Sequence, residues 1–288
     1  MIYKKYGEVF KTIRQQHRFA LSYFESVGIS KGMLSRFENG KSMLSFDKLI
    51  LALQEMNMSL QTFLVFLNNK VPDYVETKFR AIDTAYWNGN TKKLKEIYEE
   101  HIQYYNPKEG NFGIENYAIA LSAKAHFSPL KDDELEEIGS YLERVIVWSL
   151  YELNILLNSV EQLPLELLFK LIKKLIHDEE YQYIWTNAEF RLLIVRVVFR
   201  TSLRYIEVNM KNNSQSIIEQ SRVLIPEDDF TCAILIRFAE GYWFYEYGNE
   251  ILGNKIMKQV IKILEDIDAV HYRNFFIRYL RKIRKLEN

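Results

Sequence analysis

The sequence has few of the residues that interrupt regular structure or cross-link a chain. Its 288 residues include one cysteine, five prolines and 11 glycines. All-β sandwiches and barrels need turn-forming residues every few positions, so this scarcity favours an all-α fold. The single Cys232 cannot form an intramolecular disulfide, which agrees with a reducing compartment.

Long apolar runs and a net charge are also missing. No uninterrupted apolar run approaches the ~18–20 residues that cross a bilayer, and the best candidate, Leu192 to Phe199, contains Arg196. No apolar signal segment follows the N-terminal lysines. With 48% hydrophobic residues and a formal net charge of zero, the chain does not have the composition of a disordered protein. We therefore expect a folded cytoplasmic protein that does not contact a membrane.

The residue patterns of enzymes and metal sites are missing as well. None of the five histidines has a partner at zinc-ligand spacing, and no glycine-rich phosphate loop occurs. His177 and the three acidic residues after it are more typical of a polar helix end than of a metal cluster. We expect no catalytic activity, no metal and no cofactor.

The charge is divided unevenly along the chain. Residues 1–67, which we call the head, hold nine Lys and Arg against five Asp and Glu, a net charge of +4. The rest of the chain holds 29 against 33, a net charge of −4. Opposite signs on two segments indicate two different tasks, although +4 on a small domain is also unremarkable.

Hydrophobic periodicity and capping residues predict helices throughout the chain. In the head we expect five short helices near residues 3–17, 20–26, 31–38, 46–56 and 60–67. A linker is expected at 68–71. The body, residues 72–288, should follow as an antiparallel helical array. Its eleven expected helices lie near residues 72–88, 91–105, 112–126, 130–145, 147–159, 164–178, 186–208, 213–224, 228–247, 249–266 and 270–286.

The expected helix at 31–38 has two contrasting faces. Leu34 and Phe37 lie three residues apart and should face the core. The opposite face is small, polar and cationic, with Lys31, Gly32, Ser35, Arg36 and Asn39. Lys and Arg reach phosphates or guanine acceptors, and Gly permits close approach, so this composition suits a helix that enters a major groove. An ordinary solvated helix face is the alternative.

The head also resembles a known family. The resemblance is carried by the stretch Ser30-Lys31-Gly32-Met33-Leu34-Ser35-Arg36-Phe37-Glu38-Asn39-Gly40, with Tyr6-Gly7 before it and Ser59-Leu60-Gln61-Thr62-Phe63 after it. This pattern is similar to lambda-repressor-like (XRE) helix-turn-helix domains. More narrowly, the stretch from Ser35 to Gly40 followed by Ser42-Met43-Leu44-Ser45-Phe46-Asp47-Lys48-Leu49 is similar to the Rgg/GadR/MutR regulators. The resemblance implies DNA contacts for Ser30, Lys31, Gly32, Ser35, Arg36 and Asn39, and a pair between Arg14 and Glu38. Gly32-Met33 departs from the polar pair usual in the family.

For the body, the same resemblance implies a tetratricopeptide-like array that binds a short signalling peptide and forms a homodimer. A weak internal repeat agrees with this: Tyr86 to Asn90 and Phe244 to Asn249 each end an aromatic helix at Gly-Asn. Stacked helix pairs of this kind form a solenoid with a concave face that suits an extended peptide.

Six residues of the body are candidate peptide contacts. Asn158 matches an asparagine that peptide-binding relatives use, and Glu161 stands where those relatives have arginine, so a cationic peptide group could be preferred there. Arg196 and Arg200, followed by Arg204, recur every four residues on an otherwise apolar helix. Salt bridges to a neighbouring helix are their alternative role. Tyr242 and Tyr245 offer aromatic contact area, with core packing as the default.

Together these patterns predict a sequence-specific DNA-binding transcriptional regulator controlled by a short peptide. Double-stranded DNA, the peptide and a second copy of the chain are the expected partners, with RNA polymerase as a further candidate. The alternative is a peptide- or protein-binding adaptor whose helix-turn-helix no longer binds DNA.

Overall fold

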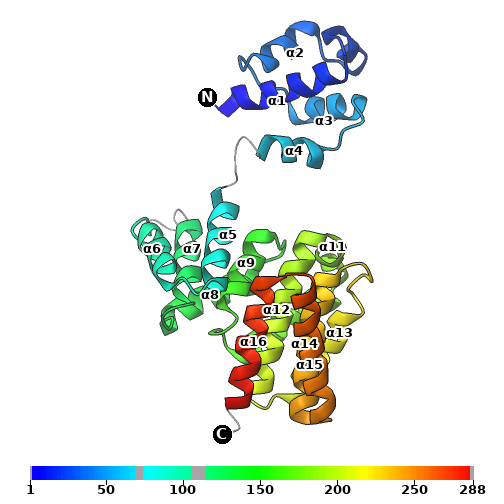
Figure 1. Ribbon diagram of the computed structural model, residues 1–288. Coiled ribbons are helices and arrows are strands. Elements are labelled where there is room, and N and C mark those ends of the chain that lie inside the picture. Colours follow the sequence, from blue (N-terminus) through cyan, green and yellow to red (C-terminus); the bar gives the residue numbers. More distant parts are fainter. Residues whose placement is uncertain (1, 69–73, 106–113, 286–288) are drawn as a thin grey trace. The chain divides into compact units, whose positions relative to one another are not determined.

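The computed structural model of the chain describes residues 2–68, 74–105 and 114–285, and these residues are helical with no strand among them (Figure 1). The predicted all-α fold is confirmed. The chain separates into two compact units, residues 1–74 and residues 75–288. We call them the N-terminal unit and the C-terminal unit and describe each by itself.

The N-terminal unit consists of short helices around an aromatic core. They are α1 (Ile2–Gln16), the 3₁₀ helix η1 (Leu21–Val27), α2 (Lys31–Glu38), α3 (Phe46–Glu55) and α4 (Leu60–Asn68). Phe10 lies at the centre, with its ring 5.9 Å from Phe24 and 5.6 Å from Phe37. Gly7 lets α1 cross α2 closely, because a Cβ at this position would lie 2.0 Å from the carbonyl oxygen of Phe37.

The C-terminal unit is an array of largely antiparallel helices. They are α5 (Tyr74–Trp87), α6 (Thr91–Ile102), α7 (Ile114–Lys124), α8 (Asp132–Arg144), α9 (Leu150–Ser159), α10 (Leu165–His177), η2 (Glu179–Tyr181), α11 (Gln182–Thr186), α12 (Ala188–Glu207), α13 (Lys211–Arg222), α14 (Phe230–Tyr247), α15 (Glu250–Asp266) and α16 (Val270–Lys285). The eleven expected helices are all present, and the short η2 and α11 were not expected. The expected linker is only partly described: Asn68 ends α4, and residues 69–71 lie outside the described residues.

The repeated Gly-Asn sequence has a local physical role at both of its positions. Asn90 begins α6 and accepts a hydrogen bond from the amide of Lys93 over 3.0 Å. Asn249 begins α15 and accepts one from the amide of Leu252 over 2.9 Å. Each asparagine therefore satisfies an amide that the first turn of a helix leaves free, which stabilises a helix–turn–helix hinge.

The last helix packs into the core of the C-terminal unit. Phe276 of α16 is fully buried between Phe199 of α12 and Phe238 of α14, with ring centroids 5.6 and 4.3 Å away. On the same helix, the rings of Tyr272 and Phe275 contact the ring of Trp87 of α5, with centroids 5.2 and 4.8 Å apart. The array thus brings its first and last helices together around α12.

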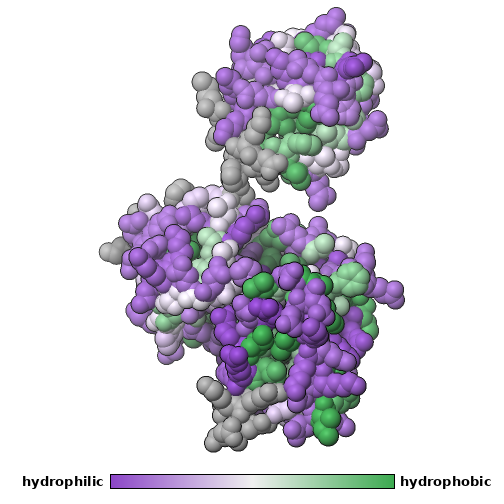
Figure 2. Space-filling view, in the orientation of Figure 1, coloured by the Kyte–Doolittle hydropathy of each residue, from purple (hydrophilic) through white to green (hydrophobic). Residues whose placement is uncertain are grey.

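On the face shown in Figure 2, each unit is mostly hydrophilic, with separate hydrophobic areas. Among the described residues no single helix is long and apolar enough to cross a membrane. Only α3 and α4 taken together, a pair bent by 100°, meet the length and composition of a span.

Candidate functional sites

The helix α2 has the two faces that its sequence predicts. Ser30 precedes it in an extended conformation and caps it by accepting a hydrogen bond from the amide of Met33 over 3.3 Å. Leu34 and Phe37 are fully buried. This burial fixes the rotation of α2 about its axis, so the opposite face points away from the core.

The outward face of α2 carries all six predicted DNA-contact residues. Ser35 is half-buried and the other five are exposed: Ser30, Lys31, Gly32, Arg36 and Asn39. Asn39 donates a hydrogen bond to the carbonyl oxygen of Ser35 over 2.7 Å. A Cβ built at Gly32 would meet no atom of the described part of the chain within 4 Å, so packing there gives no reason for glycine.

A buried ion pair holds α2 against α1. The guanidinium of Arg14 donates to both carboxylate oxygens of Glu38, with Nε–Oε1 at 2.5 Å and Nη2–Oε2 at 2.8 Å. A third bond joins Arg14 Nη1 to the carbonyl oxygen of Phe19 over 2.6 Å. The hydrogen bond with Glu38 raises the pKa of Arg14. The pairing that the family resemblance implied is therefore present, and it orients the outward face of α2.

In the C-terminal unit, four of the six predicted peptide contacts lie in one polar cluster that joins α5, α9, α12 and the chain after α7. We call it the inner cluster; it consists of Asp83, Tyr86, Trp87, His126, Asn158, Glu161, Arg196 and Arg200. Arg196 forms a bidentate pair with the carboxylate of Asp83, and its guanidinium lies 5.5 Å from the centre of the Trp87 ring.

Arg200 is a buried residue of the inner cluster. Its Nε lies 3.1 Å from Glu161 Oε1, and its Nη1 donates to the carbonyl oxygen of Leu157 over 3.0 Å. The ring of Tyr86 lies 4.9 Å from the guanidinium. Its Nη2 atom is buried and has no hydrogen-bond partner among the residues that the structure describes.

One turn further along α12, Arg204 donates to the carbonyl oxygens of Val160 and Leu163 over 2.7 and 2.6 Å. The arginines of α12 thus pair with neighbouring helices, which was their alternative role. Two of them satisfy carbonyl groups that the end of α9 leaves free.

Asn158 is held in a hydrogen-bond chain. Its Nδ2 donates to the carbonyl oxygen of Asn154 over 2.8 Å, so its Oδ1 is left to accept from His126 Nε2 over 2.7 Å. Desolvation, followed by the positive charge of Arg200, lowers the pKa of His126 from 6.5 to about 4. His126 is therefore neutral near pH 7, and its Nε2 carries the proton.

Tyr242 and Tyr245 lie apart from these polar contacts. Tyr242 is 2% exposed, and its ring contacts Tyr279 of α16 at 5.9 Å. Tyr245 is buried where α14 meets α15. The two helices approach closely there, because a Cβ on Gly253 would lie 2.3 Å from the backbone nitrogen of Tyr245. The structure places both tyrosines in the helical core, which was their default role, and as placed neither offers a free surface to a ligand.

Sequence reasoning did not find Asp83, Tyr86, Trp87 and His126 as members of the cluster. His126 and Asn158 are 32 residues apart, Glu161 and Arg200 39, and Asp83 and Arg196 113. Tyr86 and Trp87 do belong to the aromatic segment that ends α5 and that has a counterpart near the end of α14. Among the described residues, no three His, Cys, Asp or Glu side chains are grouped closely enough to hold a metal ion.

Comparison with known proteins identifies the family. Residues 91–277 match the C-terminal domain of the HTH-type transcriptional regulator Rgg. The chain belongs to the Rgg family. As a member of this family it is a transcriptional regulator and not an enzyme.

Solved structures agree with this Rgg fold over almost the whole chain. Rgg2, the SHP pheromone receptor of Streptococcus dysgalactiae, has a TM-score of 0.75 at 20% identity and covers 96% of this chain and 99% of its own. PrgX in its complex with cCF10 has a TM-score of 0.69 at 17% identity, covering 97% and 99%. ComR of S. thermophilus, bound to DNA and its signalling peptide ComS, has a TM-score of 0.59 at 14% identity. The match covers 95% of this chain and 97% of ComR. At these identities the likeness establishes the fold.

Proposed function

We propose that this Rgg-family regulator binds double-stranded DNA through the outward face of α2 and that a short peptide bound near the inner cluster controls it. The observation that carries the DNA part is the face itself. Lys31 and Arg36 are exposed beside Gly32, and a Cβ built there has no neighbour within 4 Å among the described residues. The other side of the helix is buried in the core.

The chemistry of this face suits duplex DNA. Arg36 can donate two parallel hydrogen bonds to a guanine edge, and Lys31 can neutralise a phosphate. No acidic residue lies among the outward-facing residues of α2, since the helix's one carboxylate, Glu38, is buried against Arg14. The missing side chain at Gly32 leaves room for close approach of the DNA backbone.

Peptide control is supported by the polar groups of the inner cluster. The Glu161 side chain remains about half exposed, and a cavity of ≈ 250 Å³ beside the cluster is lined in part by Asp83, Trp87 and Tyr272. Because Glu161 already pairs with Arg200, its charge is balanced within the protein. The sequence-based expectation of a cationic peptide group at this point therefore loses its main reason, and peptide backbone amides and carbonyls become the better matched partners.

Further parts of the proposal concern assembly and location. The regulator would act in the cytoplasm as a homodimer, with its two α2 helices reading half-sites about one helical turn, ~34 Å, apart. Peptide binding would shift the population of dimer geometries through its different affinity for each of them. RNA polymerase is the candidate partner at the promoter. The complex of ComR with DNA and its signalling peptide ComS supports this proposal by analogy.

The DNA part is tested by fluorescence polarisation with labelled duplexes tiled across the DNA that flanks the gene. We expect one tile to bind tightly and to lose affinity steeply as salt rises, because each neutralised phosphate releases counterions. Arg36→Ala should abolish the preference for that tile. Arg80→Ala, which removes an exposed arginine of α5, is the matched control and should leave it intact.

The alternative function, an adaptor with an inactive helix-turn-helix, predicts a different result. All tiles would then bind equally weakly, Arg36→Ala would change nothing, and selection from random duplexes would enrich no sequence.

For the peptide part, a library of short synthetic peptides is screened for changes in the affinity of the DNA complex. Asn158→Ala should remove the response, while Asn154→Ala on the same helix should keep it.

A further inference from the structure

A groove runs along α14 on a different face from the one that packs on α16. It consists of two hollows of ≈ 670 and ≈ 680 Å³ that share Arg222, Arg237 and Glu240. Helices α13 and α15 supply its walls and α14 its floor. The groove involves none of the inner-cluster residues and none of the six DNA-contact residues of α2.

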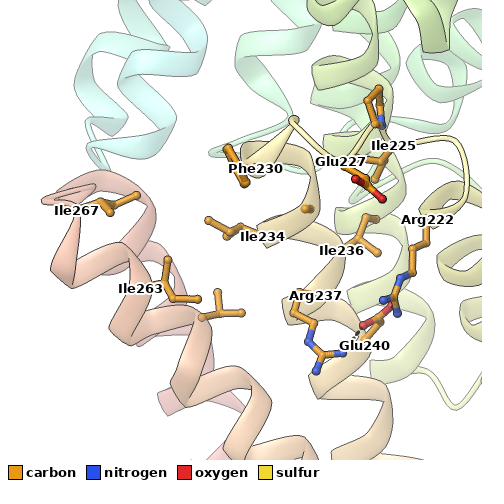
Figure 3. Close-up of a pocket in the computed structure, with 13 residues that line it drawn as sticks. Arg222, Ile225, Glu227, Phe230, Ile234, Ile236, Arg237, Glu240, Ile263 and Ile267 are labelled. Carbon is orange, nitrogen blue, oxygen red and sulfur yellow. Dashed lines mark hydrogen bonds and ion pairs between the residues drawn. The ribbon is translucent and has the colours of Figure 1, made fainter.

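The first hollow is strongly apolar. Phe230 and Ile234 of α14 face Ile263 and Ile267 of α15 across it (Figure 3). Phe230, Ile263 and Ile267 are all exposed to solvent despite their size. Exposed apolar side chains that line a hollow together indicate an interaction site more strongly than scattered ones do. The second hollow is lined by the half-buried Phe244 of α14 and by Leu252 of α15, which is exposed.

The two hollows meet at an ion cluster. Arg222 Nη1 and Arg237 Nη1 contact the two oxygens of Glu240 at 2.6 and 2.9 Å. The Glu240 side chain is 10% exposed, whereas those of Arg222 and Arg237 are 63% and 48% exposed. The anion is therefore buried under two cations whose remaining N–H groups reach the groove. The other acids that line the hollows, Glu219 and Glu227, are exposed residues of α13 and of the loop after it.

The spacing of the apolar and charged features along the groove matches the repeat of a bound α-helix. Phe230 and Phe244 are 14 residues apart, which is about 21 Å at 1.5 Å per residue. Arg237 of the ion cluster lies midway, seven residues or about 10 Å along the helix axis from each phenylalanine. Seven residues of an α-helix cover about the same distance in two turns and return to the same side. An extended chain rises ~3.3 Å per residue and covers the same distance in three residues. Because side chains alternate along a strand, its third residue would point to the opposite side, away from the groove.

We propose that this groove binds an amphipathic helix of a partner protein. The helix carries an acidic residue that meets Arg222 and Arg237, and an apolar residue two turns away on either side. Burial of the apolar side chains supplies most of the affinity, and the acidic residue sets the register. The site is separate from both the DNA-contact face and the inner cluster, so the regulator gains a third interaction surface.

The test uses the full-length protein and a labelled, designed helical peptide with leucine at its first and fifteenth positions and glutamate at its eighth. A second peptide has lysine in place of the glutamate. We expect the glutamate peptide to bind at least about tenfold more tightly, a difference of about 1.4 kcal/mol. Ile263→Asp should weaken it at least tenfold, and Arg237→Ala should reduce the difference between the two peptides. Ile251→Asp, on an exposed part of α15 that does not line the groove, is the matched control and should have no effect.

Several results would overturn the proposal. One is equal affinity for the two peptides, and a second is no binding of either peptide. Another is the same loss from Ile251→Asp as from Ile263→Asp. If sedimentation velocity shows that the protein self-associates and that Ile263→Asp dissolves the assembly, the groove is occupied by a second copy instead. Should Ile263→Asp fail to fold by circular dichroism, Ile267→Asp at a more exposed position replaces it.

Discussion

Arg14 and Glu38 form a buried bidentate pair that joins the last turns of α1 and α2. Removal of one partner leaves the other charge buried and unpaired. We therefore expect Arg14→Met to lower the free energy of unfolding of the N-terminal unit by about 3–5 kcal/mol. Urea unfolding followed by circular dichroism measures this loss.

The double variant Arg14→Met/Glu38→Leu removes both charges and should recover much of that stability. Recovery stays partial, because the carbonyl oxygen of Phe19 also loses its partner. If the double variant is no more stable than Arg14→Met, the pair contributes through packing and not through its charges.

Two glycines of the N-terminal unit should respond in opposite ways to a single methyl group. Gly32→Ala should raise the free energy of unfolding by roughly 0.5–1 kcal/mol, because alanine favours the helix and its Cβ meets nothing. The same change should weaken DNA binding if DNA approaches α2 closely. Gly7→Ala should lower stability by about 1–3 kcal/mol, because its Cβ would overlap the carbonyl oxygen of Phe37. Thermal unfolding and polarisation binding of both variants separate the two effects.

His126 should make the C-terminal unit sensitive to acid. Its pKa is about 4 in the folded protein and near 6.5 in an exposed histidine, so the unfolded chain takes up the proton first as pH falls. The free energy of unfolding should therefore be unaffected by this residue above pH 6.5. It should fall by up to about 3 kcal/mol as the pH approaches 4.

Urea unfolding at pH 7, 5.5 and 4 checks this dependence against His126→Gln. The variant cannot gain the proton, so the stability difference between the two proteins should change with pH in the stated direction. A constant difference at all three values would contradict the burial of a neutral His126.

Cys232 provides a reporter of unfolding. Burial, followed by the nearby carboxylate of Asp229, raises the pKa of this thiol to about 12. At pH 8 the thiolate fraction is then roughly 10³-fold below that of an exposed cysteine, and access is blocked as well. We expect a disulfide reagent such as DTNB to react with the folded protein only as fast as the chain opens. Since this is the only cysteine, rapid reaction without denaturant would show that α14 is locally mobile.

The amino-acid sequence by itself determined the helices and their order. Side-chain oxygens at Ser30, Asn90 and Asn249 satisfy amides within three residues of the chain, and apolar spacing within α2 dictates which side is buried. Such effects depend on near neighbours only, so they can be read from a sequence. The exposed polar and cationic face of α2 could be predicted for the same reason.

Only the tertiary structure decided what the arginines of α12 do and where the groove lies. Arg196 and Arg200 could have faced a ligand or a neighbouring helix, and the choice depends on Asp83 and Glu161, which approach only when distant segments pack together. Tyr242 and Tyr245 entered the core because α15 and α16 cover them. The groove along α14 likewise exists because α13 and α15 pack on α14 and leave one of its faces open, and that spacing is set by packing that no local pattern encodes.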